Sequence, residues 1–271
     1  MNRIEKRIKE VLEREERYLI SLLPLGDPDL EASLKLADLY LEAGSDLVEI
    51  AMPSRDPRCD SRQIAEAGAR AFDNQTDLNP YFETIRQIRK NHPDEPLEVM
   101  FYSDVLLGYG IEAFVDQLAR SDIDSLLLAD SVLLGEDVLG PLDSCLQPTG
   151  IPRIRFMPHP FKESLLDDFA ANARLFVILQ SIADEAGNRP MVDPRNVELV
   201  ERLRALNMQA AITLAYGINS PQRVRESVAT GADGIIVGTV LVDLIHAGDY
   251  PTLKDFIHSL KQNLMVGKDA S

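Results

Sequence analysis

Short apolar runs alternate with amphipathic segments along most of the chain. The runs fall at residues 17–23, 46–51, 97–102, 125–129, 153–157, 175–179, 209–214 and 234–237. Parallel strands that are covered on both faces give continuous apolar stretches, whereas half-exposed strands alternate between apolar and polar residues. The pattern therefore predicts eight buried strands of a parallel sheet.

Helical spacing of apolar residues fills the intervals between these runs. The first predicted helix runs from the turn at 26–28 to about residue 43. The others cover residues 62–72, 80–91, 111–120, 135–145, 162–173, 194–206 and 220–231. Eight strand–helix units without a linker predict an α/β fold, a single (β/α)8 TIM barrel domain over residues 1–271, because a doubly wound sheet usually has fewer strands. Ile4, Ile8, Val11 and Leu12 recur at helical spacing and predict an N-terminal helix that caps the bottom of the barrel.

The charge balance narrows the range of partners. The 271 residues carry a formal net charge of −16. Nucleic acids and anionic membranes attract basic surfaces, so we expect neither as a partner. A phosphorylated small molecule stays compatible with this charge, because backbone N–H groups can hold phosphate without a net positive protein.

Cysteine, histidine and targeting signals give few further constraints. The two cysteines, Cys59 and Cys145, lie far apart, and the four histidines lack metal-ligand spacing, so we predict no disulfide framework and no metal site. The first residues lack the apolar core of a signal peptide, and no run of eighteen apolar residues occurs. We therefore expect a cytoplasmic protein.

Two carboxylates flank the end of the second apolar run. Glu49 lies near the end of DLVEIA, and Asp60 follows in the polar loop MPSRDPRCD. Catalytic residues of a (β/α)8 barrel lie at the carboxyl ends of its strands, and two carboxylates in different environments can take different proton-transfer roles. The alternative is that Glu49 is an ordinary strand-end residue and that Asp60 is a loop residue that contributes only solubility. The spacing alone leaves both interpretations open.

Further candidates follow other predicted strands. Gly217 and Gly238 come after the seventh and eighth runs, where barrels commonly bind phosphate, and Thr239 adds a hydroxyl; both glycines are otherwise simple turn residues. Tyr102 follows the third run as a hydrogen-bond partner or an aromatic wall. Asp130 follows the fourth run, where it orients a ring N–H or caps the next helix.

Several of these segments together resemble one family. The motifs are PLGDP, EAGSDLVEIAMPSRDPRCD, LLLAD, AYGINSPQRV and GADGIIVGT, which are spread over nearly the whole chain. The chain is similar to the alpha subunit of tryptophan synthase. The resemblance implies a (β/α)8 barrel that acts as a carbon–carbon lyase in tryptophan biosynthesis. It would cleave indole-3-glycerol phosphate to indole and glyceraldehyde 3-phosphate without a cofactor, beside a beta subunit that carries pyridoxal phosphate and consumes the indole.

The resemblance also implies roles for individual residues. Glu49 matches the general acid/base, which protonates the indole ring carbon and takes a proton from the glyceryl hydroxyl. Asp60 matches the residue that holds the indole N–H and stabilises the positive charge that develops on the ring. The family positions for substrate binding match Tyr102, Asp130, Gly217, Gly238 and Thr239, and the loop that meets the beta subunit matches Pro53, Asp56 and Pro57.

The chain departs from the family wording in two loops. The usual GVPFSDPxADGP is AMPSRDPRCDSR here, which introduces Ser54, Arg55, Ser61 and Arg62. After the sixth strand, where the family has the lid Ser-Arg-x-Gly-Val-Thr-Gly, residues 180–187 read QSIADEAG, and the acidic pair at 184–185 would repel a phosphate. Single departures elsewhere are Leu22, Asp104, Val132 and Ala215.

These departures leave three hypotheses. The leading one is a lyase of the tryptophan synthase alpha type, because both carboxylates and the glycines after the last two strands are present. A paralogue with a different substrate is favoured by the acidic pair at 184–185 and by Arg55, Arg58 and Arg62, unless these arginines simply face solvent. The third hypothesis is a non-catalytic subunit that keeps the barrel in order to bind a partner.

Overall fold

Eight parallel strands form one sheet that curls into a barrel. The computed structural model describes residues 1–160, 163, 165–182 and 193–265. Neighbouring strands pair in the order β4-β3-β2-β1-β8-β7-β6-β5. The strands are β1 (Tyr18–Pro24), β2 (Leu47–Ala51), β3 (Leu97–Phe101), β4 (Ser125–Leu128), β5 (Arg155–Met157), β6 (Phe176–Gln180), β7 (Ala211–Ala215) and β8 (Gly234–Val237). This architecture confirms the predicted (β/α)8 fold.

A single bridge joins the two ends of the sheet. Leu126 of β4 pairs with Arg153, just before β5. The Leu126 N–H donates to the carbonyl of Pro152 at 3.1 Å, and the Ile154 N–H donates back to the carbonyl of Leu126 at 2.8 Å. These two hydrogen bonds close the ring of strands.

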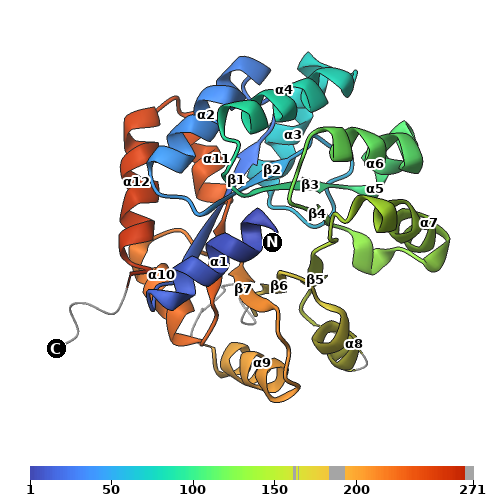
Figure 1. The fold of residues 1–271 in the computed structure, drawn as a ribbon. Helices are drawn as coiled ribbons and strands as arrows, with labels where there is room; N and C mark the ends of the chain where they lie inside the picture. The colour runs from blue at the N-terminus through green and yellow to red at the C-terminus, as the bar shows by residue number, and fades with distance from the viewer. Residues whose placement is uncertain (161–162, 164, 183–192, 266–271) are drawn as a thin grey trace.

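Helices surround the ring of strands (Figure 1). They are α1 (Arg3–Glu13), α2 (Leu30–Glu42), α3 (Arg62–Asn74), α4 (Asn79–Asn91), α5 (Ser103–Tyr109), α6 (Ile111–Arg120), α7 (Glu136–Leu146), α8 (Leu165–Asn172), α9 (Pro194–Ala205), α10 (Pro221–Ala229), α11 (Thr239–His246) and α12 (Tyr250–Gln262), with short 3-10 turns at Ser131–Leu133 and Gln147–Thr149. Ser220 caps α10 as the sequence predicts, because its hydroxyl accepts from the Arg223 N–H at 3.3 Å and Pro221 follows it.

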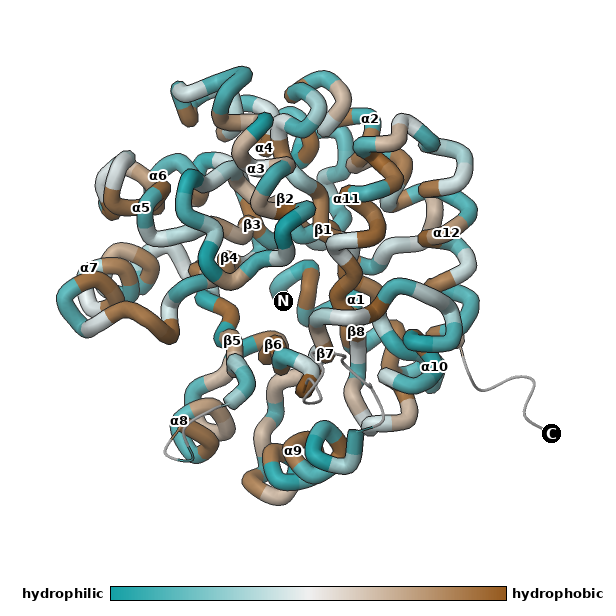
Figure 2. The backbone as a smooth tube through the Cα atoms, turned by 180° about the vertical axis from the view of Figure 1, so that it is seen from behind, coloured by the Kyte–Doolittle hydropathy of each residue, from teal (hydrophilic) through white to brown (hydrophobic). Residues whose placement is uncertain are grey.

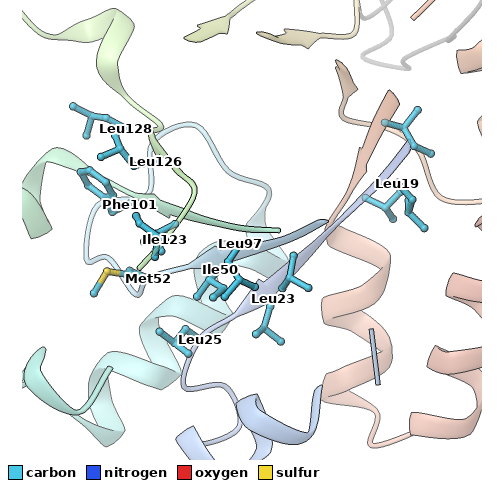
Figure 3. Close-up of a cluster of buried hydrophobic side chains, with 14 of the residues drawn as sticks. Leu19, Leu23, Leu25, Ile50, Met52, Leu97, Phe101, Ile123, Leu126 and Leu128 are labelled. Atoms are coloured by element: carbon cyan, nitrogen blue, oxygen red, sulfur yellow. The ribbon is translucent and has the colours of Figure 1, made fainter. Parts of the chain in front are cut away.

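Alternate residues of each strand belong to two separate apolar layers. On β1, Leu19 and Leu23 pack in the outer layer between strands and helices, while Ile20 and Leu22 belong to the inner layer that fills the barrel. Figure 3 shows part of the outer layer, with Ile50 beside residues of β1 and β3. Apolar segments accordingly concentrate on the strands in Figure 2, and polar segments on the outer turns of the helices.

Helix α1 closes one end of the barrel. Ile4, Ile8 and Val11 are buried in the inner layer together with Tyr18 and Phe176. In Figure 1 the helix lies across the ring of strands rather than around it. The amphipathic pattern of the first residues therefore predicted the capping helix correctly.

Several boundaries differ from those predicted. Strands shift by one or two residues, and β5 begins at Arg155 because only a bridge forms at Arg153. The sequence did not predict α5, α11 or α12, and the helix expected from residue 162 is described from Leu165 onward. Within the ranges that the structure describes, no helix is long and apolar enough to cross a bilayer.

Candidate active site

A cavity of about 450 Å³ opens at the carboxyl ends of the strands. Its wall is largely apolar, with side chains from β1, β4, β5, β6 and β8. These side chains are Leu22, Leu127, Phe156, Ile178 and Ile236. Six of the residues singled out in the sequence also line it: Glu49, Asp60, Tyr102, Gly217, Gly238 and Thr239. An apolar cavity with a few converging polar groups suits a flat aromatic ligand that carries a polar end.

Glu49 enters the cavity from the middle of β2. Its neighbours two residues away, Leu47 and Ala51, belong to the inner layer, so the strand turns Glu49 toward the barrel interior. The residue is 2% exposed, and its Oε2 has no hydrogen-bond partner. Burial, followed by repulsion from Glu98 and Asp60, raises the pKa of Glu49 well above its ordinary value. A carboxyl with a pKa raised in this way holds its proton more firmly than an exposed glutamate and can release it to a substrate.

Asp60 is partly buried on the loop that follows β2. Burial raises the pKa of its carboxyl to about 6, and a hydrogen bond with the Tyr102 hydroxyl works in the opposite direction. At neutral pH Asp60 is therefore mostly ionised, while burial favours the protonated form of Glu49. The two carboxyls experience different environments at the same cavity, as an acid and an electrostatic stabiliser require.

Two tyrosine hydroxyls hold the residue before Asp60. The backbone N–H of Cys59 donates to the Tyr102 hydroxyl at 3.3 Å, and the Tyr216 hydroxyl donates to the carbonyl of Cys59 at 2.8 Å. Tyr216 follows β7 with a positive φ of 73° and packs against the Phe156 ring with a centroid distance of 6.0 Å. Sequence reasoning missed Tyr216; its only signal was an aromatic residue between a strand and a glycine.

Another part of the cavity wall is formed by the loops after β7 and β8. Gly217 has φ 75°, a backbone conformation that favours glycine. Gly238 precedes α11, and a Cβ at this position would lie 3.1 Å from Cδ1 of Ile64. Thr239 begins α11, and its hydroxyl donates to the Ser61 hydroxyl at 2.9 Å. The start of a helix presents backbone N–H groups that favour an anion.

Asp130 does not line this cavity. It is 1% exposed, and its carboxylate accepts from the backbone N–H of Ser103 at 3.0 Å and from the Ser103 hydroxyl at 2.5 Å. In this structure Asp130 therefore fixes the start of α5, and the substrate contact expected for it stays a prediction.

Two residues that depart from the family's usual sequence, Ser54 and Asp104, form a hydrogen bond with each other. The Ser54 hydroxyl donates to Oδ1 of Asp104 at 2.7 Å, and the Arg55 N–H donates to Oδ2 of Asp104 at 3.0 Å. Asp104, in the first turn of α5, thus orders the loop after β2. The Asp104 carboxylate and the Ser54 hydroxyl suit each other as acceptor and donor.

The loop arginines do not line the cavity. Arg55 lies over the Phe72 ring at 4.7 Å, Arg58 pairs with Asp56, and Arg62 pairs with Glu66 at 2.6 Å. Their positions remove one argument for a different substrate. The other argument rests on residues 184 and 185, which lie outside the described residues. Among the residues that the structure places, no group of three or more His, Cys, Asp and Glu is arranged to hold a metal ion.

Comparisons with known proteins agree with this geometry. The sequence model of the family "Tryptophan synthase alpha chain" matches residues 8–266. A tryptophan synthase alpha chain from Photorhabdus laumondii is 32% identical over 246 residues, which are 90% of each chain. One from Edwardsiella ictaluri is 32% identical over 269 residues, 96% of this chain and 98% of the relative.

The fold has matching neighbours as well. A solved structure from Aquifex aeolicus VF5 superposes with a TM-score of 0.86 at 25% identity, covering 97% of this chain and 99% of that one. The chain belongs to the tryptophan synthase alpha chain family of carbon–carbon lyases, which cleave indole-3-glycerol phosphate in tryptophan biosynthesis and work with a beta subunit.

Proposed function

We propose that this chain cleaves indole-3-glycerol phosphate with Glu49 as the general acid/base and Asp60 as the partner of the indole N–H. One observation carries the proposal: a buried Glu49 carboxyl with an unpartnered oxygen faces the same apolar cavity as Asp60. The raised pKa of Glu49 favours a proton-bearing acid there, and the pKa of Asp60 of about 6 leaves its carboxyl mostly anionic at neutral pH.

The proposed reaction moves one proton in each direction. Glu49 gives its proton to the ring carbon that bears the glyceryl chain, and the ring nitrogen becomes positively charged. Asp60 stabilises this charge, which is larger in the transition state than in the bound substrate. Glu49, now a carboxylate, takes the proton of the adjacent glyceryl hydroxyl. The hydroxyl oxygen forms the aldehyde, the carbon–carbon bond breaks, and its electron pair restores the aromatic ring of indole. The step needs no cofactor.

The phosphate would occupy the side of the cavity formed by Gly217, Gly238 and Thr239. The supporting features are the positive φ of Gly217, the tight packing at Gly238 and the start of α11. Tyr102 contributes by holding Cys59 and Asp60.

We further propose that the beta subunit docks on the loop around Pro53, Asp56 and Pro57. Asp56 is exposed on this loop. Three exposed apolar side chains follow β3, which neighbours β2, and β4, the next strand beyond it: Leu107 is 52% exposed, Val132 38% and Leu133 60%. Exposed apolar groups of this kind favour a protein partner. A cytoplasmic location and a single domain over residues 1–271 remain predictions.

The test is a direct assay of the cleavage. The purified protein is incubated with indole-3-glycerol phosphate, alone and with a tryptophan synthase beta subunit, and indole or tryptophan is measured by chromatography. We expect product from the wild type and from the control Glu66→Gln, which changes a surface carboxyl on α3, and no product from Glu49→Gln. A folded wild type that forms no product under either condition would contradict the proposal, as would unchanged activity of Glu49→Gln.

One residue favours the alternative of a different substrate. Asp243 of α11 also lines the cavity, and its negative charge opposes a phosphate nearby. A dephosphorylated indole glycerol should then be cleaved faster than the phosphate ester. The same chromatographic assay with both compounds decides between the two substrates.

A further inference from the structure

A second buried glutamate lies beside Glu49. The strand register places Glu49 of β2 opposite Glu98 of β3, and Glu98 opposite Ser125 of β4. Met100 and Leu127, two residues further along β3 and β4, belong to the inner layer, so Glu98 and Ser125 also turn into the barrel. Three polar side chains therefore form a row across three neighbouring strands.

The row is buried, and the described residues place no cation beside it. Glu98 and Ser125 are each 0% exposed. Within the described residues neither glutamate has a salt bridge, and the ionisable groups that face the pair are Tyr18 on β1 and Asp60 on the loop after β2. From below, α1 contributes the apolar side chains Ile4, Ile8 and Val11 to the inner layer. Nothing in this environment neutralises two negative charges.

Each carboxyl of the pair has one buried oxygen without a hydrogen bond, and a proton shared between the two carboxyls would supply the missing donor. The Ser125 hydroxyl donates to Oε2 of Glu98 at 2.6 Å. Glu98 Oε1 and Glu49 Oε2 are both buried without a partner. Two carboxylates cannot donate to each other, and two like charges at adjacent buried positions cannot both persist. A proton on either carboxyl supplies the missing donor and removes one charge.

Ser125 decides which carboxyl keeps the proton. Its hydroxyl stabilises the charged form of Glu98, whereas no donor reaches Oε2 of Glu49. Burial raises the pKa of Glu98 to about 7, and the hydrogen bonds from Ser125 and Glu49 limit this rise. The pKa of Glu49 lies well above its ordinary value. The two shifts agree with the hydrogen-bond pattern.

We propose that Glu98 is a positioning residue that shares one proton with Glu49 and keeps Glu49 as the proton-bearing partner before the reaction begins. The proposal rests on the proposed function only in taking Glu49 as the acid. Once Glu49 has passed its proton to the ring carbon, it stands as a carboxylate beside Glu98, and the repulsion makes it a stronger base for the glyceryl hydroxyl. The proton returns to Glu49 from the substrate, so the pair ends as it began.

The test measures titration without substrate. Glutamate side chains are labelled with 13C at the carboxyl carbon, and the midpoints of Glu49 and Glu98 are followed by NMR in the full chain. We expect Glu98→Gln to lower the midpoint of Glu49 by at least about one pH unit, because it removes a negative charge beside Glu49. Glu49→Gln removes a protonated neighbour and its hydrogen bond but no charge, so the midpoint of Glu98 should not fall. The control Glu16→Gln, a buried change near the N-terminal end of β1, should move neither midpoint. A Glu49 midpoint that stays unchanged in Glu98→Gln, or a Glu98 midpoint that falls in Glu49→Gln, would overturn the proposal.

A kinetic measurement separates proton sharing from a merely structural role. In Glu98→Gln the alkaline limb of the kcat profile should move to lower pH, because Glu49 loses its proton earlier, while KM stays within about twofold. A uniform loss of kcat at every pH would contradict proton sharing. Coupled midpoints in a protein that fails to cleave indole-3-glycerol phosphate would support the shared proton and reject the proposed function instead.

Discussion

Three aspartates at the closed end of the barrel and the glutamate pair Glu49 and Glu98 at the open end serve opposite purposes. At the end closed by α1, Asp46, Asp124 and Asp233 each precede an even-numbered strand and accept from the backbone N–H of the preceding odd strand. Each also pairs with a basic side chain. The backbone donors are Leu19, Leu97 and Ile212, and the basic partners are Lys261, Arg89 and Arg204.

At the open end Asp27 pairs with Arg70 and Asp130 accepts from the Ser103 N–H, but Glu49 and Glu98 lack such partners among the described residues. Glu49 and Glu98 are buried at least as deeply as Asp46 and Asp124, yet no cation reaches them within the described residues. Their pKa values rise, and so does that of Asp60. Burial alone therefore does not set the role of a carboxylate. A cation and a backbone donor make it a structural link, and their absence leaves it able to exchange a proton.

The largest expected effect is on turnover at the open end. Glu49→Gln should lower kcat by about 10²- to 10⁴-fold, the usual contribution of a general acid/base, because glutamine cannot transfer a proton. Its free energy of unfolding should not fall, since no ion pair is lost. Steady-state assays and urea unfolding of the same preparation test both statements. A large loss of stability in Glu49→Gln would mean that Glu49 holds the fold together as the aspartates of the closed end do.

The converse change at the closed end should destabilise the fold without altering the groups that carry the reaction. Asp124→Ala removes the partner of the buried Arg89 and should lower the free energy of unfolding by about 3–5 kcal/mol. The neighbouring control Asp122→Ala removes a carboxylate that is 61% exposed and should change stability by about 1 kcal/mol or less. Equal effects in the two variants, measured by urea unfolding, would refute the structural role of the base carboxylates.

Asp60→Asn should lower the activity of the protein and raise its free energy of unfolding. The folded-state pKa of about 6 lies above the ordinary 3.8, so ionisation of Asp60 destabilises the fold as pH rises from about 4 to 6, and the penalty persists above that range. Asparagine removes the penalty, and above pH 7 we expect a gain of about 1 kcal/mol, reduced by partial exposure to solvent.

The same substitution should lower kcat by about 10²-fold and affect KM less, because the charge acts in the transition state. In the wild type, kcat should fall below pH 6 as Asp60 is protonated. Equal losses in kcat and in substrate affinity would instead indicate a simple binding role for Asp60. Thermal unfolding and kcat, both measured between pH 5 and 8, complete the test.

The smallest expected effect concerns the support of Asp60. Tyr216→Phe deletes the hydrogen bond to the Cys59 carbonyl and should lower stability by about 1 kcal/mol, with a modest loss in kcat. Tyr109→Phe, which deletes a surface hydroxyl bonded to Asn79, is the matched control and should leave kcat unchanged. Indistinguishable kcat values in the two variants would mean that Tyr216 does not position Asp60.

The strands were predictable because burial on both faces gives each strand a continuous run of apolar residues in the sequence. Each apolar run corresponds to a strand, with boundaries shifted by a residue or two. Helix α5 was missed because it is short: it follows Tyr102 directly and ends before Gly110, whose φ is 93°. Nothing in a single run of residues separates such a segment from a loop.

The site was predictable only in part, because pairing between distant residues is not written in local patterns. Glu49 and Asp60 stood out at a strand end, and both line the cavity. Glu98 reads as one polar residue in LEVMFY, and only the register shows that it lies opposite Glu49. Asp130 has the same strand-end signature as Glu49, yet it bonds to Ser103. Whether a strand-end carboxylate caps a helix or faces a ligand depends on a neighbour that the sequence does not identify.

The single bridge at Leu126 has a mechanical consequence for the whole ring. Every other strand boundary has at least two paired residues, from two between β7 and β8 to five between β1 and β2, whereas β4 and β5 meet at one point. The molecule thus resembles a strip of strands bent until its ends touch. Thermal fluctuations should open such a ring at its thinnest joint, so we expect the amide hydrogens at Leu126 and Ile154 to exchange with solvent sooner than those of β1.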